Sequence, residues 1–397
     1  MRRSHASSSR STRRRSALTR LAVLICTVSV FTSIARATRQ KRLDAAALKR
    51  LDRLDPAGTL RREWELIAKD EDGVSSLKNN DAAVLSPHCE ASLAAVLPLN
   101  EFTLATTPHD TVARSRLYST FARQSQQKGL TLFEEGKNLA ATQGLGLSSL
   151  FTRDETTGVH SAVLTRLDVP VRAVVVPLPS ESRAAKIIYE KTKNALLEYF
   201  PAEYFPSSSD SKSNHAKSVW LQDPSLYHFS TFHASHHLDP KPYSIGKEKD
   251  VEFDFELTSI RSAASSSCPI DAVVERVVVT PTGVVMALWN IEGGGEPGVF
   301  RDRLRDMLPN SPAEQIVKEK VIWHSTVARL LTPPFGSSDK DKSTHAALKL
   351  QSQLTEQLCG VKARLKKAWF VEEHDKLALA LGGKFDTFDA PFQCGEG

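Results

Sequence analysis

Two short runs of aromatic and β-branched residues place the strongest limit on how this chain can fold. They are residues 226–232, Leu-Tyr-His-Phe-Ser-Thr-Phe, and residues 321–331, Val-Ile-Trp-His-Ser-Thr-Val-Ala-Arg-Leu-Leu. This composition favours β-strands, in which side chains two positions apart share one face. His228 is then beside Ser230, and His324 is beside Thr326. The pattern predicts two strands that each present an imidazole and a hydroxyl together.

The sequence pattern His-x-Ser/Thr is common, so the residues around each copy say more about its role than the pattern itself. It starts at His5, His109, His228, His233 and His324. The copies at His228 and His324 are the ones inside apolar, strand-like runs. If the fold brings these runs together, a phosphate between them meets one imidazole from each side and two hydroxyl donors. Such a set supplies a base, an acid and donors for the non-bridging oxygens of a phosphodiester.

The paired runs resemble the two signature motifs of the 2H phosphoesterase superfamily, which includes 2′-5′ RNA ligase-like proteins and cyclic nucleotide phosphodiesterases. Residues 324–329 are similar to the His-x-Thr-Leu-x-Arg form of the ligase-like branch, and Ser230 stands where that branch usually has Thr. Residues 220–237 and 268–289 resemble a plant-type branch described as RNA ligase-like or cyclic nucleotide phosphodiesterase-like. The resemblance covers residues 168–381 and implies a two-lobed domain with one motif in each lobe.

The order of the expected elements also predicts an α+β fold. The elements are a strand at 169–179, a helix at 180–199, the first motif strand, a hairpin at 273–291, a helix at 299–308, the second motif strand, a helix at 344–358 and a hairpin over 367–381. Residues 251–258 alternate apolar and polar side chains and are expected to add a strand. This order predicts two lobes of antiparallel sheet with flanking helices around a central cleft, as in a 2H phosphoesterase-like fold.

Three regions are expected along the chain. Residues 1–40 form a basic N-terminal targeting or signal-anchor segment, residues 41–160 a helical or irregular region of unknown role, and residues 161–397 the catalytic domain. The apolar run at 21–34 followed by Ala-Arg-Ala is typical of a signal peptide or an uncleaved anchor. We therefore expect a secretory or endomembrane location, with membrane anchoring if the segment is retained. An organellar transit peptide and a plain disordered tail are the alternatives.

The net charge of +6 does not by itself indicate a nucleic-acid-binding protein. Residues 1–43 contain eleven Lys or Arg and no acidic residue, which leaves 41 basic and 46 acidic residues in the rest of the chain. A catalytic region with this balance is not suited to bind a DNA duplex tightly. We expect the partner to be a nucleotide or the cyclic phosphate of an RNA end, and the protein to be a monomer.

Cysteine and histidine usage gives little support for a metal site. The five cysteines include no Cys-x-x-Cys pair, so a zinc ribbon is not indicated. The four beyond residue 26 leave two alternatives open, which are up to two disulfides or unpaired buried thiols. His228, His233 and His237 could bind a metal, but alternation splits them between strand faces and no nearby carboxylate completes the set. We expect no metal and no other cofactor.

The expected activity is metal-independent hydrolysis of a cyclic phosphodiester, either a 2′,3′-cyclic nucleotide or an RNA-end phosphate. His228 and His324 are the expected acid and base, in an order that the sequence leaves open, and the same site could run in reverse to join ends. The expected substrate-binding residues are Ser230, Thr326, Phe232 and Arg329. Alternation places Phe232 on the face of His228, whereas Arg329 needs a bulge in its strand to reach the site. The alternative is a non-catalytic module that binds nucleotide ends, RNA ends or a protein.

Overall fold

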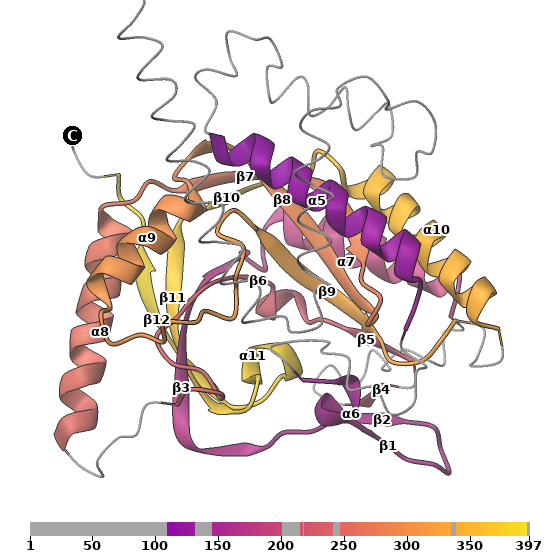
Figure 1. Cartoon of the computed structure of the whole chain (residues 1–397), viewed down its shortest axis with the longest axis horizontal. Helices are drawn as coiled ribbons and strands as arrows, with labels where there is room; N and C mark the ends of the chain where they lie inside the picture. Colours follow the sequence, from indigo (N-terminus) through magenta and orange to yellow (C-terminus); the bar gives the residue numbers. More distant parts are fainter. Residues whose placement is uncertain are drawn as a thin grey trace, which may run out of the picture. The chain divides into compact units, whose positions relative to one another are not determined.

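Two antiparallel sheets form the frame of the structure, and each draws its strands from distant parts of the chain (Figure 1). The computed structural model describes residues 109–131, 145–200, 215–216, 218–240, 247–334 and 339–394. All of these belong to one compact unit. The two motif strands lie in different sheets, so the fold has to bring the sheets together before the motifs can share a site.

The larger sheet carries the second motif. In spatial order its strands are β10 (Lys362–Leu365), β7 (Ile270–Val279), β8 (Val284–Gly294), β9 (His324–Leu330) and β5 (Val219–Leu221). Its helices are α7 (Arg183–Leu197) and α10 (Lys340–Leu358) on one face, and α5 (His109–Lys128) on the other (Figure 1). The predicted β7–β8 hairpin is present, and Gly283 in its turn has φ +79, which glycine adopts without strain.

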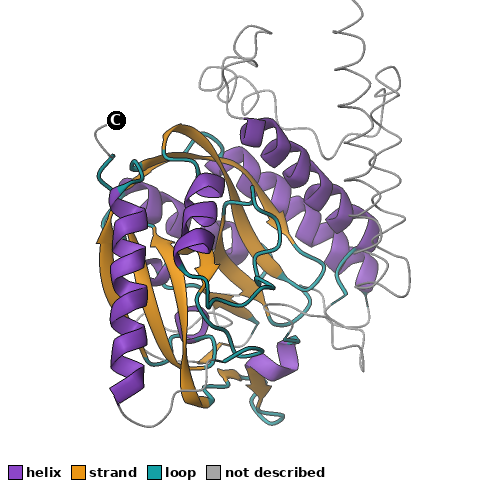
Figure 2. Cartoon of the chain, turned by 60° about the vertical axis from the view of Figure 1, so that its left-hand side comes forward, coloured by secondary structure: helices purple, strands orange, loops and turns teal. Residues whose placement is uncertain are grey.

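The smaller sheet carries the first motif. Its strands are β12 (Phe385–Pro391), β11 (Lys367–Asp375), β3 (Arg166–Pro177) and β6 (His228–His233), in that order. Its outer helices are α8 (Lys247–Ser265) and α9 (Pro297–Met307), which Figures 1 and 2 show alongside these strands. A buried ion pair between Arg172 of β3 and Glu256 of α8 (2.8 Å) joins sheet and helix. The first motif strand lies at the edge of its sheet, where one side of its backbone is open to other partners.

Short elements complete the unit near one end of the two sheets. They are α6 (Leu147–Leu150), β1 (Phe151–Arg153), β2 (His160–Ala162), β4 (His215–Ala216), the 3-10 turn η2 (Pro224–Leu226) and α11 (Ala378–Leu381). β1, β2 and β4 pair as a small sheet. A separate apolar cluster, which includes Phe151, Trp220 and Leu381, packs this sheet against β5 and α11. The cluster fixes α11 next to the motif strands.

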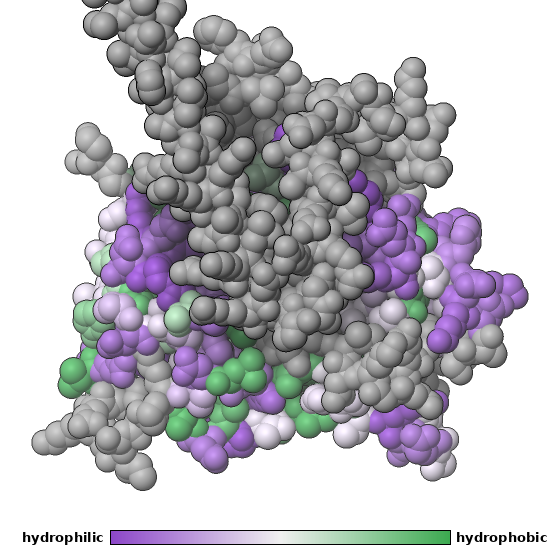
Figure 3. Space-filling model, in the orientation of Figure 1, coloured by the Kyte–Doolittle hydropathy of each residue, from purple (hydrophilic) through white to green (hydrophobic). Residues whose placement is uncertain are grey.

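The main hydrophobic core lies on the sheet faces that α7, α8, α9 and α10 cover. Phe229 of the first motif strand stacks on Trp323, which precedes the second, with ring centroids 4.7 Å apart and an interplanar angle of 6°. Trp289 of β8 meets Phe229 edge-on at 5.4 Å. These aromatic contacts join the two sheets directly behind the motif residues. On the outside, Figure 3 shows hydrophilic and hydrophobic residues interspersed over the coloured part of one face.

The predicted fold class is confirmed, since the structure is α+β with two antiparallel sheets and flanking helices, an arrangement compatible with a two-lobed 2H phosphoesterase-like fold. Two local expectations were wrong. Residues 251–258 belong to α8, where Phe253, Leu257 and Ile260 share the face that packs on the core. Residues 378–381 form α11 rather than a strand, and β11 pairs instead with β12.

The region N-terminal to the predicted catalytic domain contributes elements to the same unit. α5 and β1 fall within the predicted region 41–160, β2 (His160–Ala162) crosses its boundary, and these elements pack against the sheets. The predicted domain boundaries themselves stay predictions. The predicted targeting segment at 1–40 lies outside the described residues. Among the helices that are described, none has both the length and the apolar character needed to span a membrane.

Candidate active site

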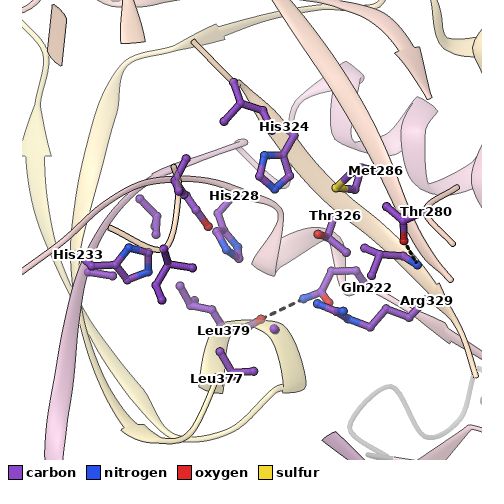
Figure 4. A pocket seen from close by; sticks show the side chains of 18 of the residues that line it. Gln222, His228, His233, Thr280, Met286, His324, Thr326, Arg329, Leu377 and Leu379 are labelled. Atoms are coloured by element: carbon purple, nitrogen blue, oxygen red, sulfur yellow. Dashed lines mark hydrogen bonds between the residues drawn. The ribbon is translucent and has the colours of Figure 1, made fainter. Parts of the chain in front are cut away.

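Both motif strands present their imidazole and hydroxyl side chains to one cavity, which has a volume of about 410 Å³. Figure 4 shows His228 and His324 projecting into it from different strands, with Thr326 and Arg329 farther along the wall. The polar side chains that line it are Gln222, His228, Ser230, His233, Thr280, Lys318, Glu319, His324, Thr326, Arg329 and Glu373. Apolar residues complete the lining. They come from β3, β8, the segment 316–322 and the segment 377–380 at α11. The structure therefore brings both imidazole–hydroxyl pairs together.

A β-bulge in the first motif strand decides which side chains follow Ser230 into the cavity. Ser230 pairs with Val175 of β3, but the next pair is Phe232 with Val174, so Thr231 has no partner in the ladder. The extra residue reverses the alternation beyond it. His233 therefore lines the cavity and Phe232 points into the main core, where it is 2% exposed. The prediction that Phe232 shares the face of His228 was wrong for this reason.

The second motif strand contains a bulge at the equivalent place. Thr326 pairs with Met286 of β8 and Ala328 pairs with Val285, which leaves Val327 without a partner in β8; its carbonyl accepts from the Gln222 N–H at 3.1 Å. The reversal brings Arg329 onto the cavity face, together with His324 and Thr326. Burial lowers the pKa of Arg329 to about 10, so its guanidinium stays positively charged at neutral pH. Arg329 reaches the site by the kind of irregularity that the sequence prediction required.

His228 is held in one tautomer by its own chain. Its Nδ1–H donates to the carbonyl of Leu226 at 2.8 Å, because a carbonyl oxygen can only accept. In the neutral ring this leaves Nε2 as the atom with a free lone pair. Burial lowers the pKa of His228, the Leu226 carbonyl opposes that effect, and the charge of Arg329 adds to it. The ring is thus oriented and mostly neutral before a substrate binds.

His324 lies in more positive surroundings. Burial, followed by the charge of Arg301 and the neighbouring His228, lowers the pKa of His324 to about 4. No described residue forms a hydrogen bond with its ring, whereas the peptide before it is firmly held. The Tyr118 hydroxyl accepts from the N–H of Trp323 at 2.9 Å and lies within hydrogen-bond distance of the Trp323 and Trp289 carbonyls. The position of His324 is therefore set by its backbone.

Sequence reasoning missed two polar residues that line the cavity near α11. Glu373 of β11 is 8% exposed, and its carboxylate accepts from the N–H of Leu379 at 2.9 Å. Burial raises the pKa of Glu373 to about 7. Gln222 donates from Nε2 to the Leu379 carbonyl at 3.0 Å (Figure 4). Neither residue belongs to a motif, so only the register of β11 and the position of α11 could reveal them.

The histidines at 233, 236 and 237 form a row of imidazoles rather than a metal-binding set. Ring centroids are 6.1 Å apart for His233 and His236, and 6.5 Å apart for His236 and His237. Burial and the neighbouring rings lower the pKa of His233 to about 3. Glu372, His374 and Asp386 are the three described residues whose potential metal-ligand atoms all lie within 4.8 Å of one another. The alternative metal site at His228, His233 and His237 is therefore not assembled.

A scan against protein-family models and a search of curated proteins found no match. A conserved protein of unknown function from Agrobacterium tumefaciens has a similar solved structure, with a TM-score of 0.37 and 13% identity over 56% of this chain and 86% of that one. Usb1 from Kluyveromyces marxianus gives a TM-score of 0.32 and 13% identity over 56% of this chain and 98% of Usb1. The structure of the same Usb1 with uridine monophosphate gives a TM-score of 0.30 and 12% identity, again over 56% of this chain and 98% of Usb1.

Proposed function

We propose that this cavity hydrolyses a cyclic phosphodiester without a metal ion, using His228 and His324 as acid and base. The observation that supports the proposal is the convergence of two imidazoles, two hydroxyls and a guanidinium on one cavity, from strands in separate sheets. These groups meet the needs of phosphoryl transfer, which are proton transfer at two oxygens and stabilisation of the non-bridging oxygens. The motif resemblance to 2H phosphoesterases supports the same chemistry.

The phosphate would bind between the two motif strands. Ser230 and Thr326 donate hydroxyl hydrogen bonds to its non-bridging oxygens, and the Arg329 guanidinium balances their negative charge. A bound anion favours the protonated form of a nearby imidazole, so substrate binding raises the low pKa values of His228 and His324. The site thus acquires its catalytic proton together with its substrate.

The two histidines have different environments, which support one assignment of their roles. The Leu226 carbonyl stabilises a proton on His228, whereas Arg301 disfavours one on His324. His324 then removes a proton from water as the water oxygen bonds to phosphorus. The bond from phosphorus to the ribose oxygen breaks, and His228 gives its proton to that oxygen. The product is a phosphomonoester with a free hydroxyl, and the two rings recover their starting protonation through solvent.

The size of the cavity supports a small substrate of the nucleotide class. A volume of about 410 Å³ suits one nucleotide rather than a folded nucleic acid. A 2′,3′-cyclic nucleotide, or the cyclic phosphate at an RNA end, offers a strained phosphodiester and a ribose leaving oxygen. Joining of RNA ends would use the hydroxyl of a second RNA end in place of water: its oxygen bonds to phosphorus, the same ribose oxygen leaves, and the product is a phosphodiester.

Turnover of uridine 2′,3′-cyclic phosphate by the full chain tests the proposal. His228→Ala and His324→Ala should each lower kcat by about 10²- to 10⁴-fold. His345→Ala, which removes an exposed imidazole from α10, is the matched control and should leave kcat unchanged. A chelator should have no effect, whereas a metal hydrolase would lose activity. Binding without turnover by the unmodified protein would instead identify a non-catalytic module.

A substrate with a better leaving group tests the assignment of roles. The p-nitrophenyl ester of a nucleoside monophosphate releases a phenolate that needs no acid. His228→Ala should therefore regain most of its activity on this ester, while His324→Ala should remain impaired. The opposite pattern would exchange the roles of the two histidines, and impairment of both on this ester would contradict the acid–base mechanism.

A further inference from the structure

Arg301 is a buried arginine that contacts both motif segments without lining the cavity. It projects from α9, is 7% exposed, and lies behind the walls that carry Ser230 and His324. Its Nε–H donates to the Thr231 carbonyl at 3.0 Å and Nη2 donates to the Ser230 carbonyl at 3.1 Å. Nη1 donates to the carbonyl of Lys320 in the segment before β9. One guanidinium therefore links the first motif strand to the segment that leads into the second motif strand.

The position of these carbonyls explains why an arginine is needed. In a regular strand successive carbonyls point to opposite sides, and here two successive carbonyls reach one group because Thr231 is the bulged residue. β6 is an edge strand, so no neighbouring strand can bind them on this side. A planar guanidinium donates in several fixed directions at once, which an ammonium group cannot do. Arg301 thus stabilises the bulge that follows Ser230 and turns His233 toward the cavity.

The charge of Arg301 also acts on the second motif. Its guanidinium carbon lies 5.5 Å from the centroid of the Trp323 ring, and Trp323 precedes His324. The charged and titratable groups near His324 are Arg301 behind it, His228 across the cavity, Arg329 on its own strand, and Lys318 and Glu319 in the segment that precedes it. Arg301 is a fixed, buried cation in this set, and it lowers the pKa of His324.

We propose that Arg301 is a positioning residue that sets the relative placement of the two motifs through the Ser230, Thr231 and Lys320 carbonyls, and that places a fixed positive charge behind His324. The inference rests on the proposed function for its effect on turnover. Its structural and electrostatic parts can be measured without turnover. Because its three donor nitrogens contact the protein, Arg301 is not expected to touch substrate.

Two substitutions separate the fork of hydrogen bonds from the charge. Arg301→Lys keeps the charge and loses the fork, whereas Arg301→Gln loses both. Both should lower kcat by about 10- to 100-fold with KM changed less than about threefold, because misplacement affects the reacting groups more than binding. Arg303→Gln on the same helix is the matched control, since Arg303 contacts Ser266 and Ser267 and no motif residue.

The pKa of His324, followed by NMR of its ring proton, is the measurement that does not need activity. It should rise by about one unit in Arg301→Gln and stay near the wild-type value in Arg301→Lys and Arg303→Gln. An unchanged His324 titration in Arg301→Gln, in folded protein by circular dichroism, would overturn the electrostatic part of the proposal. Loss of kcat only in proportion to unfolded protein would overturn the positioning part. Absence of turnover in the wild type would overturn the proposed function and leave the titration as the test of Arg301.

Discussion

Glu373 places a buried carboxyl group in a cavity that is otherwise suited to an anion. Burial raises its pKa to about 7, although the Leu379 N–H partly opposes this effect. The folded protein therefore keeps a proton that the unfolded chain loses above its ordinary carboxyl pKa, and stability falls as pH rises from that value to about 7. Glu373→Gln retains an oxygen for Leu379 and cannot ionise. We expect the variant to be more stable than wild type above pH 7, by up to ~3 kcal/mol.

Denaturant unfolding at about pH 4 and pH 8 checks this expectation. The unfolding free energies of wild type and Glu373→Gln should be nearly equal at the lower pH and differ at the higher one. The low pKa values of His233 and His324 affect both proteins alike and cancel in the comparison. Glu319→Gln controls for loss of a carboxylate at an exposed position on the same cavity. The same stability difference at both pH values would show that Glu373 is not protonated in the folded state.

The bulge residues of the two motif strands, Thr231 and Val327, explain which cavity-lining side chains could be predicted from the sequence. His228, Ser230, His324 and Thr326 precede the bulges, so plain alternation placed them correctly. Beyond each bulge the alternation reverses, which removes Phe232 from the cavity and brings in His233. The sequence does not mark the bulge positions, because the groups that stabilise the first one, such as Arg301, come from a distant helix.

At the scale of elements, α5 is the part whose role was not predictable from its own sequence. Tyr118 of α5 is fully buried, and its hydroxyl bonds to the backbone of Trp323 and Trp289 where β8 and β9 meet. Tyr118→Phe leaves a buried N–H without its partner, which should cost about 1–3 kcal/mol of unfolding free energy. It should also lower kcat, because the peptide before His324 loses its anchor. Denaturant unfolding and kinetics on the same preparation measure both effects.

Tyr199→Phe is the matched control for this substitution, because Tyr199 is half-buried and its hydroxyl bonds, among the described residues, to the Gln353 side chain alone, at 3.5 Å. It should change stability and kcat little. Equal behaviour of the two variants would show that α5 merely covers the sheet. The contact of α5 with the motif depends on residues 171 to 205 positions further along the chain.

At the scale of the whole described unit, the sequence predicted two sheet-bearing lobes but not the covalent link between them. Cys268, which precedes β7, and Cys394, which follows β12, form a disulfide with a Cα–Cα distance of 4.0 Å. The Cys394 N–H also donates to the Ser267 carbonyl at 3.2 Å. The bridge therefore connects the larger sheet to the end of the smaller one. The choice between disulfides and thiols was open in the sequence because pairing depends on three-dimensional proximity.

Structural disulfides persist in oxidising compartments, so this bridge supports the proposal that the protein enters the secretory pathway through its N-terminal segment. Expression of the full chain fused to a glycosylation-acceptor tag tests that proposal. Glycosylation of the tag is expected in the lumen, whereas import into an organelle would leave the tag unmodified and would support the transit-peptide alternative.

The disulfide also predicts how stability is shared between the two sheets. It closes a loop with a sequence separation of 126 residues, so its loss should increase the conformational freedom of the unfolded chain considerably. The double variant Cys268→Ser, Cys394→Ser should lose about 2–5 kcal/mol of unfolding free energy, and each single variant should lose a similar amount. Glu373, which lines the cavity, lies on β11, and β11 pairs with β12. Weaker attachment of the C-terminal end of β12 should therefore raise KM more than it lowers kcat. Denaturant unfolding and steady-state kinetics check both expectations, and wild-type stability in the double variant would show that the bridge does not join the sheets in solution.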